Sequence, residues 1–180
     1  WIDSTNRLAR IQAGAVGRDI VDQLARYGFT MGHEPDSIEF STLGGWIATH
    51  ASGMKKNKYG NIEDLVLDVR VVTPRGVVSR EGVPPRESIG LDARRWIVGS
   101  EGTLGIVTAA TLRTVPLPGG TCVTLLGFPT LDAAVRAGLD LRKFEPVGCD
   151  LLDRRLLSVT RRTAGGEGVG SIPPAVGAAL

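Results

Sequence analysis

Two hydroxyl residues, Ser41 and Thr42, stand just before a glycine pair, Gly44 and Gly45. Because glycine has no Cβ, another group can approach the backbone closely there. Residues 46–49 are predicted to open a helix that ends near Gly53. Hydroxyls, paired glycines and a helix start can form a phosphate cradle, in which backbone N–H groups face an anion. The same residue types also make a tight connection between a strand and a helix, so this pattern alone leaves both interpretations open.

The chain resembles a known flavoenzyme family at two separate places. The string PDSIEFSTLGGWIATHASGMKKNKYGNIEDLV, at 35–66, resembles the flavin-binding domain of the alkyldihydroxyacetonephosphate synthase family. These enzymes belong to the PCMH-type branch of the vanillyl-alcohol-oxidase superfamily of FAD-linked oxidases. The string GSEGTLGIV, at 99–107, is similar to the other FAD-contacting loop of that superfamily. The resemblance covers most of residues 1–118 and continues more loosely to about residue 157.

The resemblance implies that FAD is the cofactor and that three segments contact it. The implied cofactor-binding residues are Asp36, Ser37, Ile38, Glu39, Phe40, Ser41, Thr42, Gly44 and Gly45, then Thr49, His50, Ala51 and Ser52, and finally Glu101, Gly102, Thr103, Leu104, Gly105, Ile106 and Val107. Ser41 and Thr42 would hydrogen-bond phosphate oxygens, and the glycine pair would let the chain pass close to the cofactor. The loop 101–105 would lie near the ribose and adenine, with the backbone of Ile106 or Val107 at the adenine edge. Without the surrounding motif, Glu101 would be interpreted as a solvated loop carboxylate.

The two histidines are not predicted to be catalytic. His50, followed by Ala-Ser, has the appearance of a base or a flavin attachment site. The synthase pattern has an arginine at this position, so we expect a polar contact near the cofactor phosphates, with an exposed histidine at a helix end as the alternative. His33 is expected to be a turn residue. The sequence identifies no catalytic residue and no metal site.

Lys55, Lys56 and Lys58 form a short basic cluster next to Tyr59. This cluster could attract a phosphorylated substrate, or it could be an ordinary solvated loop, since lysines are rarely buried. One tyrosine and three lysines make no stacking platform for single-stranded nucleic acid. With a net charge of +2, the chain gives no reason to expect a nucleic-acid partner.

Asp150 departs from the family pattern. The segment 146–153 aligns so that an arginine of the family's cap domain falls on Asp150. Arginine binds phosphate or carboxylate groups with two parallel hydrogen bonds, whereas aspartate reverses the charge. This difference bears on the substrate and not on FAD.

Composition indicates a globular chain, with 42% hydrophobic and 22% charged residues. No apolar run reaches the roughly 20 residues of a membrane span, and no signal peptide is visible. Cys122 and Cys149 lie in apolar runs without metal or redox spacing, so both are predicted to be buried free thiols. We therefore expect a cytoplasmic protein, peripheral to a membrane in one alternative, and peroxisomal if the source is eukaryotic.

Hydrophobic periodicity and turn residues predict the following elements. They are a strand at 8–13, a helix at 17–28, a strand at 65–73 that forms a hairpin with Val77 and Val78, a polar loop at 81–91, a short helix at 93–97 capped by Asp92, a strand at 105–115, a strand at 121–127, a helix at 130–144 capped by Thr130, a strand at 147–152 and an irregular tail at 163–180. In the strand 65–73, Leu65, Leu67, Val69 and Val71 are expected on one face and Asp68 and Arg70 on the other. The Pro-Gly-rich stretch 116–120 is the clearest domain boundary.

We therefore expect an α+β fold. Residues 1–118 would be the second half of a PCMH-type FAD-binding domain, and residues 119–180 the start of a ferredoxin-like cap domain. Because the chain begins at Trp1 and the family's pyrophosphate-binding loop would lie upstream, we expect an internal piece that retains FAD weakly.

The resemblance implies an enzyme that exchanges the acyl group of acyl-dihydroxyacetone phosphate for a fatty alcohol in ether-lipid synthesis, with no net redox change. The alternative is an FAD-dependent oxidoreductase that acts on a 2-hydroxyacid or an alcohol, and a third is a non-catalytic flavin-binding fragment. The expected partner is a small-molecule lipid or hydroxyl-bearing substrate, and a homodimer is the candidate assembly.

Overall fold

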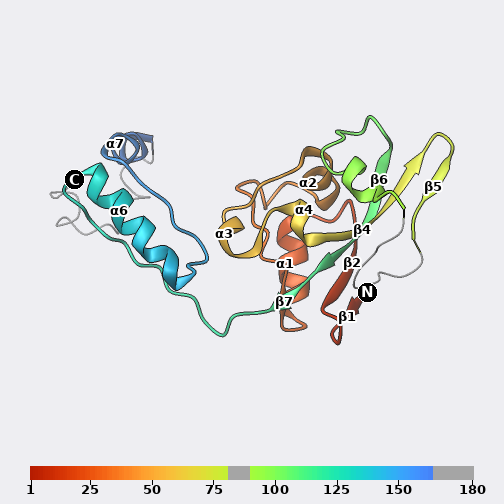
Figure 1. Ribbon diagram of the computed structural model, residues 1–180, viewed down its shortest axis with the longest axis horizontal. Helices are drawn as coiled ribbons and strands as arrows, with labels where there is room; N and C mark the ends of the chain where they lie inside the picture. The colour runs from red at the N-terminus through yellow and green to blue at the C-terminus, as the bar shows by residue number, and fades with distance from the viewer. Residues whose placement is uncertain (81–89, 164–180) are drawn as a thin grey trace. The chain divides into compact units, whose positions relative to one another are not determined.

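The structure is a computed structural model that describes residues 1–80 and 90–163. The chain divides into two compact units, residues 1–119 and 120–180, and each is described by itself (Figure 1). Most of the predicted loop at 81–91 and of the tail at 163–180 lies outside the described residues.

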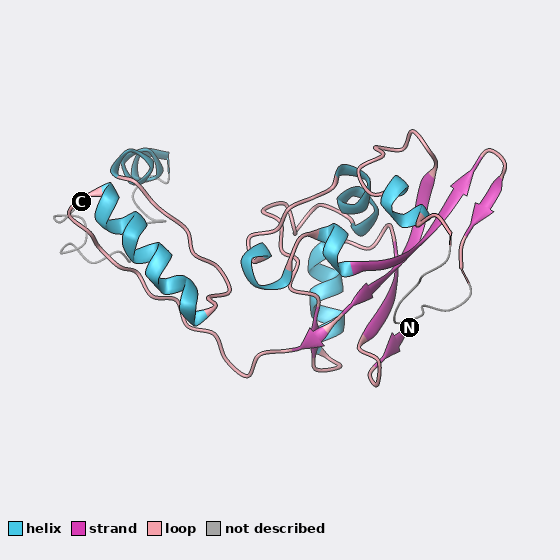
Figure 2. Cartoon of the chain, viewed as in Figure 1, coloured by secondary structure: helices cyan, strands magenta, loops and turns pink. Residues whose placement is uncertain are grey.

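The first unit mixes short helices with strands. Its elements are β1 (Ile2–Asp3), β2 (Leu8–Gln12), α1 (Gly17–Ala25), β3 (Phe29–Thr30), α2 (Leu43–Thr49), α3 (Lys56–Tyr59), α4 (Ile62–Leu65), β4 (Val66–Thr73), β5 (Gly76–Val78), α5 (Ala93–Ile97), β6 (Ile106–Arg113) and β7 (Val115–Pro116). Figure 2 shows the strands together, with helices beside them. The predicted strands at 8–13 and 105–115, the hairpin and the helix at 93–97 are all present. Asp92 caps α5, because its carboxylate accepts a hydrogen bond from the Arg94 N–H.

Five strands form an antiparallel sheet in the order β1-β2-β6-β4-β5. The centre of the sheet is β6, which pairs with β2 on one side and β4 on the other. A second, two-stranded sheet joins β3 to β7. The strand β6 therefore leads from the loop 99–105 into the middle of the unit, so that this loop is anchored at one end by the sheet.

One face of the five-stranded sheet carries the hydrophobic core. Helices α1 and α2 contribute Ile20, Leu24, Leu43, Trp46 and Ile47 to it, and the strands contribute Ala9, Val66, Val69, Val71, Ala110 and Leu112. Burial of these side chains positions α2 against β2 and β6 and is the main force that fixes its place. The predicted helix at 17–28 is confirmed with an earlier end, since α1 stops at Ala25.

The opposite face of the sheet contains a partly buried ion pair that the sequence did not predict. The predicted place of Leu65 in the strand at 65–73 was wrong, because Leu65 ends α4. The pairing register shifts at Leu67, and beyond this point Val69 and Val71 face the core while Arg70 is exposed. Asp68 is only 6% exposed. Its carboxylate lies 3.1 Å from Arg10 Nη1, which also donates to the Thr111 hydroxyl. These three residues are register partners on neighbouring strands, so the pair is a cross-strand contact.

The second unit contains α6 (Leu131–Leu141), a 3-10 turn η1 (Arg142–Phe144) and α7 (Arg154–Thr163). Thr130 caps α6 as predicted, because its hydroxyl accepts from the Ala133 N–H. The predicted strands at 121–127 and 147–152 were wrong, since none of the residues described in this unit forms a strand. A strand needs a neighbour for its N–H and C=O groups, and the described part of this unit supplies none.

The thiols of Cys122 and Cys149 are free, as predicted, but both are exposed, so the expectation that they are buried was wrong. Each lies in an apolar run that is not packed into a sheet. The assignment of this unit to a cap domain stays a prediction.

Candidate functional site

The start of α2 is closed to an anion by its own hydrogen bonds. The Leu43 and Gly44 N–H groups donate to the Ala15 and Ala13 carbonyls at 3.1 and 2.8 Å. The Gly45 N–H donates to the Thr42 hydroxyl, 3.4 Å away. The first three N–H groups of the helix are thus all bonded. This helix start fits the interpretation as a tight connection, and phosphate binding by the motif stays a prediction.

The glycine pair lies inside α2 and not before it, so the predicted helix start at Trp46 was wrong, as was the end near Gly53. The two glycines differ in their surroundings. A Cβ at Gly44 would lie 2.9 Å from the Ala13 Cβ, so only glycine allows this close approach to the end of β2. A Cβ at Gly45 would meet only the Thr42 hydroxyl, at 3.5 Å. Gly45 is therefore on the open face of α2, where a cofactor could pack.

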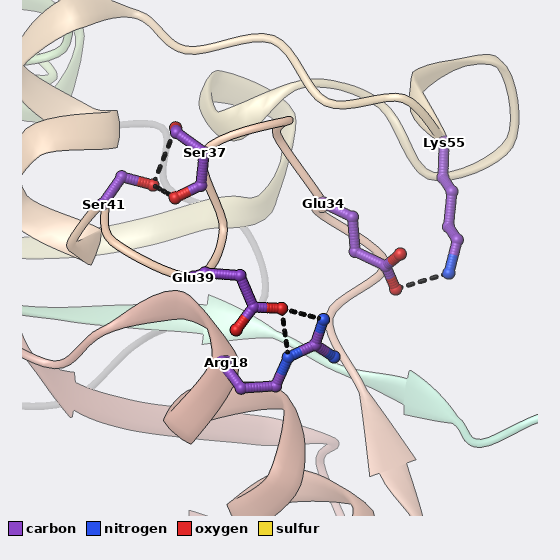
Figure 3. A network of polar contacts seen from close by, with 6 residues as sticks. All are labelled: Arg18, Glu34, Ser37, Glu39, Ser41 and Lys55. Atoms are coloured by element: carbon purple, nitrogen blue, oxygen red, sulfur yellow. Dashed lines mark hydrogen bonds and ion pairs between the residues drawn. The ribbon is translucent and has the colours of Figure 1, made fainter. Parts of the chain in front are cut away.

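Ser41 stabilises the segment that precedes α2. Its hydroxyl donates to the Ser37 carbonyl at 2.8 Å and accepts from the Ser37 hydroxyl and from Trp46 Nε1, at 3.0 and 2.7 Å. Figure 3 shows the Ser37 and Ser41 side chains turned toward each other. A hydroxyl has one donor and two acceptor positions, so this one is fully used by the protein. The expected contact of Ser41 with a phosphate stays a prediction, and it would require Ser41 to exchange one of these bonds.

The rest of the first segment is mostly exposed. Ile38 is buried in the core, whereas Asp36, Ser37 and Glu39 are exposed and Phe40 is 86% exposed. The Arg18 guanidinium donates to Glu39 Oε1 from Nε and Nη2, at 2.9 and 2.6 Å (Figure 3). The hydrogen bonds from Arg18 hold the pKa of the Glu39 carboxyl below its usual value. This ion pair connects α1 to the segment.

The helix α2 ends at an unusual residue. His50 follows Thr49 in the left-handed region, with φ 57° and ψ 47°. Its side chain is 53% exposed, and Nε2 lies 3.2 Å from Glu63 Oε2. This geometry fits the alternative of an exposed histidine at a helix end, while the expected polar contact with the cofactor stays a prediction. Thr49 and Ser52 are also exposed, and Ala51 is half-buried.

The loop 99–105 is hydrogen-bonded to the end of α2. The Gly99 N–H donates to the Ile47 carbonyl and the Glu101 N–H to the Ala48 carbonyl, both at 2.9 Å. Gly99 has φ +79°, and its backbone lies against the His50 ring. The two motifs that the sequence singled out, about fifty residues apart, are thus joined by main-chain hydrogen bonds. Tertiary structure brings them together, as one site requires.

The same loop presents unpaired donors. In the described part of the chain, the Gly102, Leu104 and Gly105 N–H groups donate to no protein acceptor. Glu101 and Gly102 are both left-handed, with φ 48° and 80°, and residues 101–104 are exposed. Free N–H groups of such a turn can bind an anion or a heterocycle edge. These donors fit a nucleotide cofactor such as FAD. Ile106 and Val107 begin β6, which fixes the far end of the loop.

His33 is fully buried, so its expected role as a turn residue was wrong. Its ring packs edge-on against Trp46, with ring centroids 4.9 Å apart. Neither ring nitrogen has a hydrogen-bond partner. Burial lowers the pKa of His33 to about 4, and the nearby Glu63 carboxylate opposes this effect. No local pattern in the sequence signals this burial, because it arises from packing between distant segments.

The basic cluster is only partly solvated. Lys55 forms an ion pair with Glu34 and is half-buried, whereas Lys56 and Lys58 are exposed on α3 (Figure 3). Two of the three lysines thus agree with the solvated alternative. The described residues contain no group of three or more His, Cys, Asp or Glu side chains placed to hold a metal. Within the same residues, no helix has the length and apolar character needed to cross a bilayer.

Comparisons with known proteins agree with this geometry. Residues 1–81 match the family described as FAD binding domain. An alkyldihydroxyacetonephosphate synthase from Caenorhabditis elegans is 47% identical over 155 residues, which cover 85% of this chain and 26% of that protein. A D-lactate dehydrogenase from Archaeoglobus fulgidus is 31% identical over 166 residues, 91% of this chain and 37% of that protein.

A solved structure of alkyldihydroxyacetonephosphate synthase superposes with a TM-score of 0.69 at 38% identity, covering 82% of this chain and 27% of that one. The chain thus spans about a quarter of the synthases that it matches. The predicted α+β fold with a PCMH-type FAD-binding domain is confirmed, and so is FAD as the cofactor. Residues 1–81 match an FAD-binding domain, and the predicted resemblance to the FAD-linked oxidase family, and to the alkyldihydroxyacetonephosphate synthases within it, is confirmed.

Proposed function

We propose that the full-length protein containing this chain is an FAD-dependent synthase of ether-lipid precursors. It would convert acyl-dihydroxyacetone phosphate and a fatty alcohol into alkyl-dihydroxyacetone phosphate and a free fatty acid. The C–O bond to the acyloxy group breaks, a C–O bond to the alcohol oxygen forms, and the alcohol proton leaves with the products. Bound FAD would supply the reactive centre for this exchange, with no net oxidation or reduction.

The observation that carries this proposal is the junction between α2 and the loop 99–105. The main-chain hydrogen bonds from Gly99 and Glu101 to the end of α2 bring both cofactor motifs into one surface. On that surface the unpaired N–H groups of the loop would bind the nucleotide part of FAD, and the open face at Gly45 would allow close packing. The similarity to the nematode synthase, 47% against 31% for the lactate dehydrogenase, favours the exchange reaction over hydride transfer.

The test uses purified full-length flavoprotein. We expect alkyl-dihydroxyacetone phosphate to form from the acyl precursor and a long-chain alcohol. The bound flavin should stay oxidised, as followed by its visible absorbance, when alcohols or 2-hydroxyacids are added without an electron acceptor. Flavin bleaching by a 2-hydroxyacid, with no ether product, would contradict the proposal. Absence of flavin from the folded protein would contradict the assignment of the site itself.

A second candidate, an FAD-dependent oxidoreductase of 2-hydroxyacids or alcohols, is supported by Asp150. An acid stands where the synthase pattern has an arginine, and a carboxylate repels a phosphate dianion. Asp150 is exposed here, so solvent weakens this repulsion to roughly a fivefold effect on affinity. Asp150→Arg should therefore improve the apparent affinity for acyl-dihydroxyacetone phosphate about fivefold in a synthase. If wild type and Asp150→Arg use that substrate equally well, Asp150 lies away from the substrate and is no argument for an oxidoreductase.

The partner of the site would then be a lipid substrate. A homodimer and a location at a membrane surface, peroxisomal in a eukaryote, follow only from the resemblance and are part of this proposal. Light scattering of the purified protein and flotation with liposomes test the two separately.

A further inference from the structure

The residue that ends α2 has an unfavourable backbone conformation for its type. His50 is left-handed, with φ 57° and ψ 47°, at a helix end where glycine or asparagine is usual. A residue with a Cβ that is held in this region often has a functional reason. The contacts of the His50 side chain therefore bear on what it does.

Glu63 approaches His50 from a firmly held position. The helix α4 is fixed next to the end of α2, because the Ile62 N–H donates to the Ala51 carbonyl and the Ser52 hydroxyl to the Asn61 side chain. A capping box between Asn61 and Asp64 fixes the start of α4 itself. Glu63 Oε2 is buried and lies 3.2 Å from His50 Nε2.

The Glu63 carboxylate has an unused acceptor. The two atoms are close, but their alignment does not make a hydrogen bond, so Oε2 is buried without a donor. The buried His33 is also within electrostatic range of Glu63, and it too has no hydrogen-bond partner. A small rotation of the half-exposed His50 ring would aim its N–H at Oε2. A buried acceptor without a donor is unfavourable, so the hydrogen bond that this rotation would form should stabilise the rotated ring.

The other side of the His50 ring faces the cofactor loop. A Cβ at Gly99 would lie 3.2 Å from His50 Nδ1, so the ring and the loop backbone are in close contact. The loop is bonded to the Ile47 and Ala48 carbonyls just before His50. The imidazole thus lies between α4 and the loop that carries the unpaired N–H groups, with about half of its surface exposed.

We propose that Glu63 is a positioning residue for FAD: it holds the His50 imidazole against the loop 99–105, so that α2 and the loop keep one binding geometry. The inference rests on the proposed FAD site and adds a residue that lies outside the three segments expected to contact FAD. Glu63 would act only through His50. Removal of either side chain should therefore weaken FAD binding to the same extent, and removal of both should do no further damage.

A double-mutant cycle in the full-length flavoprotein tests this dependence. Glu63→Gln keeps the shape of the side chain without its charge. His50→Asn removes the imidazole but suits the left-handed backbone, so it should not impair folding. Each single variant and the double variant are titrated with FAD, and the melting temperature of each apoprotein is measured. Asp22→Asn, an exposed carboxylate on α1, is the matched control for loss of one charge.

We expect each single variant and the double variant to bind FAD about tenfold more weakly than wild type, equivalent to about 1.4 kcal/mol. The apoprotein melting temperatures should stay within about 2 °C, and the control should bind FAD normally. An unchanged affinity in Glu63→Gln would overturn the inference, as would a hundredfold loss in the double variant. If Glu63→Gln fails to fold, Glu63→Asp takes its place, because the shorter side chain withdraws the carboxylate from His50. It should bind FAD about tenfold more weakly than wild type, and normal FAD affinity in Glu63→Asp would overturn the inference. Failure of the wild type to bind FAD would instead reject the proposed function.

Discussion

The glycine pair in α2 allows a sharp test, because its two members should respond oppositely to the same substitution. Gly44→Ala places a Cβ 2.9 Å from the Ala13 Cβ and 3.2 Å from the Ala13 carbonyl oxygen. Overpacking of this kind costs about 1–3 kcal/mol, and alanine regains up to about 1 kcal/mol over glycine in a helix. The free energy of unfolding should therefore fall by about 1 kcal/mol. Gly45→Ala meets no close neighbour and should raise it by about 0.5–1 kcal/mol.

Urea unfolding of the apoprotein measures both changes, and FAD titration measures binding. If FAD packs on the open face of α2, Gly45→Ala should weaken FAD at least about tenfold although the apoprotein is more stable. The bulkier Gly45→Val should abolish binding while circular dichroism stays native. Loss of stability in Gly45→Ala would refute the packing argument. Normal FAD affinity in both Gly45 variants would refute the placement of the cofactor on this face.

Three further substitutions test features outside the glycine pair. His33 has a folded-state pKa of about 4, below the roughly 6.5 of an unfolded histidine, so the unfolded chain binds the proton more readily. The contribution of His33 to the free energy of unfolding should thus fall by about 3 kcal/mol between pH 6.5 and pH 4. The His33→Leu variant should lack this acid sensitivity, and a pH profile of unfolding that is the same in this variant as in wild type would contradict the burial of His33. Asp68→Ala should lower the free energy of unfolding by about 1–3 kcal/mol, because it leaves Arg10 without its carboxylate, and the double variant Arg10→Met with Asp68→Leu should recover most of this loss. If urea unfolding shows the same loss in the single and the double variant, the ion pair is not the cause. Arg18→Gln should raise the pKa of Glu39 toward its ordinary value in an NMR titration, and no change would mean that the ion pair does not form in solution.

Local signals in the sequence predicted the elements that depend on local interactions. The hairpin of β4 and β5 follows from alternating apolar residues around a turn that contains proline and glycine. Asp92 and Thr130 cap their helices because each short polar side chain accepts a hydrogen bond from a backbone N–H in the first turn that follows it. The FAD segments were located through resemblance, and the structure adds that they meet.

The errors arose where packing between distant segments decides the structure. Glycine is a poor helix former, so Gly44 and Gly45 were placed before α2, whereas close packing of Gly44 on Ala13 puts them inside it. The burial of His33 and the approach of Glu63 to His50 likewise depend on how α2 and α4 pack, which no spacing in the chain encodes. The strands expected at 121–127 and 147–152 had the right composition but no partner strand in the described part of their unit.

Amide hydrogen exchange with and without FAD, on the full-length protein, tests the central claim most directly. The Gly102, Leu104 and Gly105 N–H groups have no acceptor in the described protein and should exchange fast without FAD and slowly with it. The Leu43 and Gly44 amides, already bonded to Ala15 and Ala13, should be slow in both states. Protection of the loop 101–105 on addition of FAD is the predicted result. Protection confined to other parts of the protein, with this loop still exchanging fast, would contradict the account.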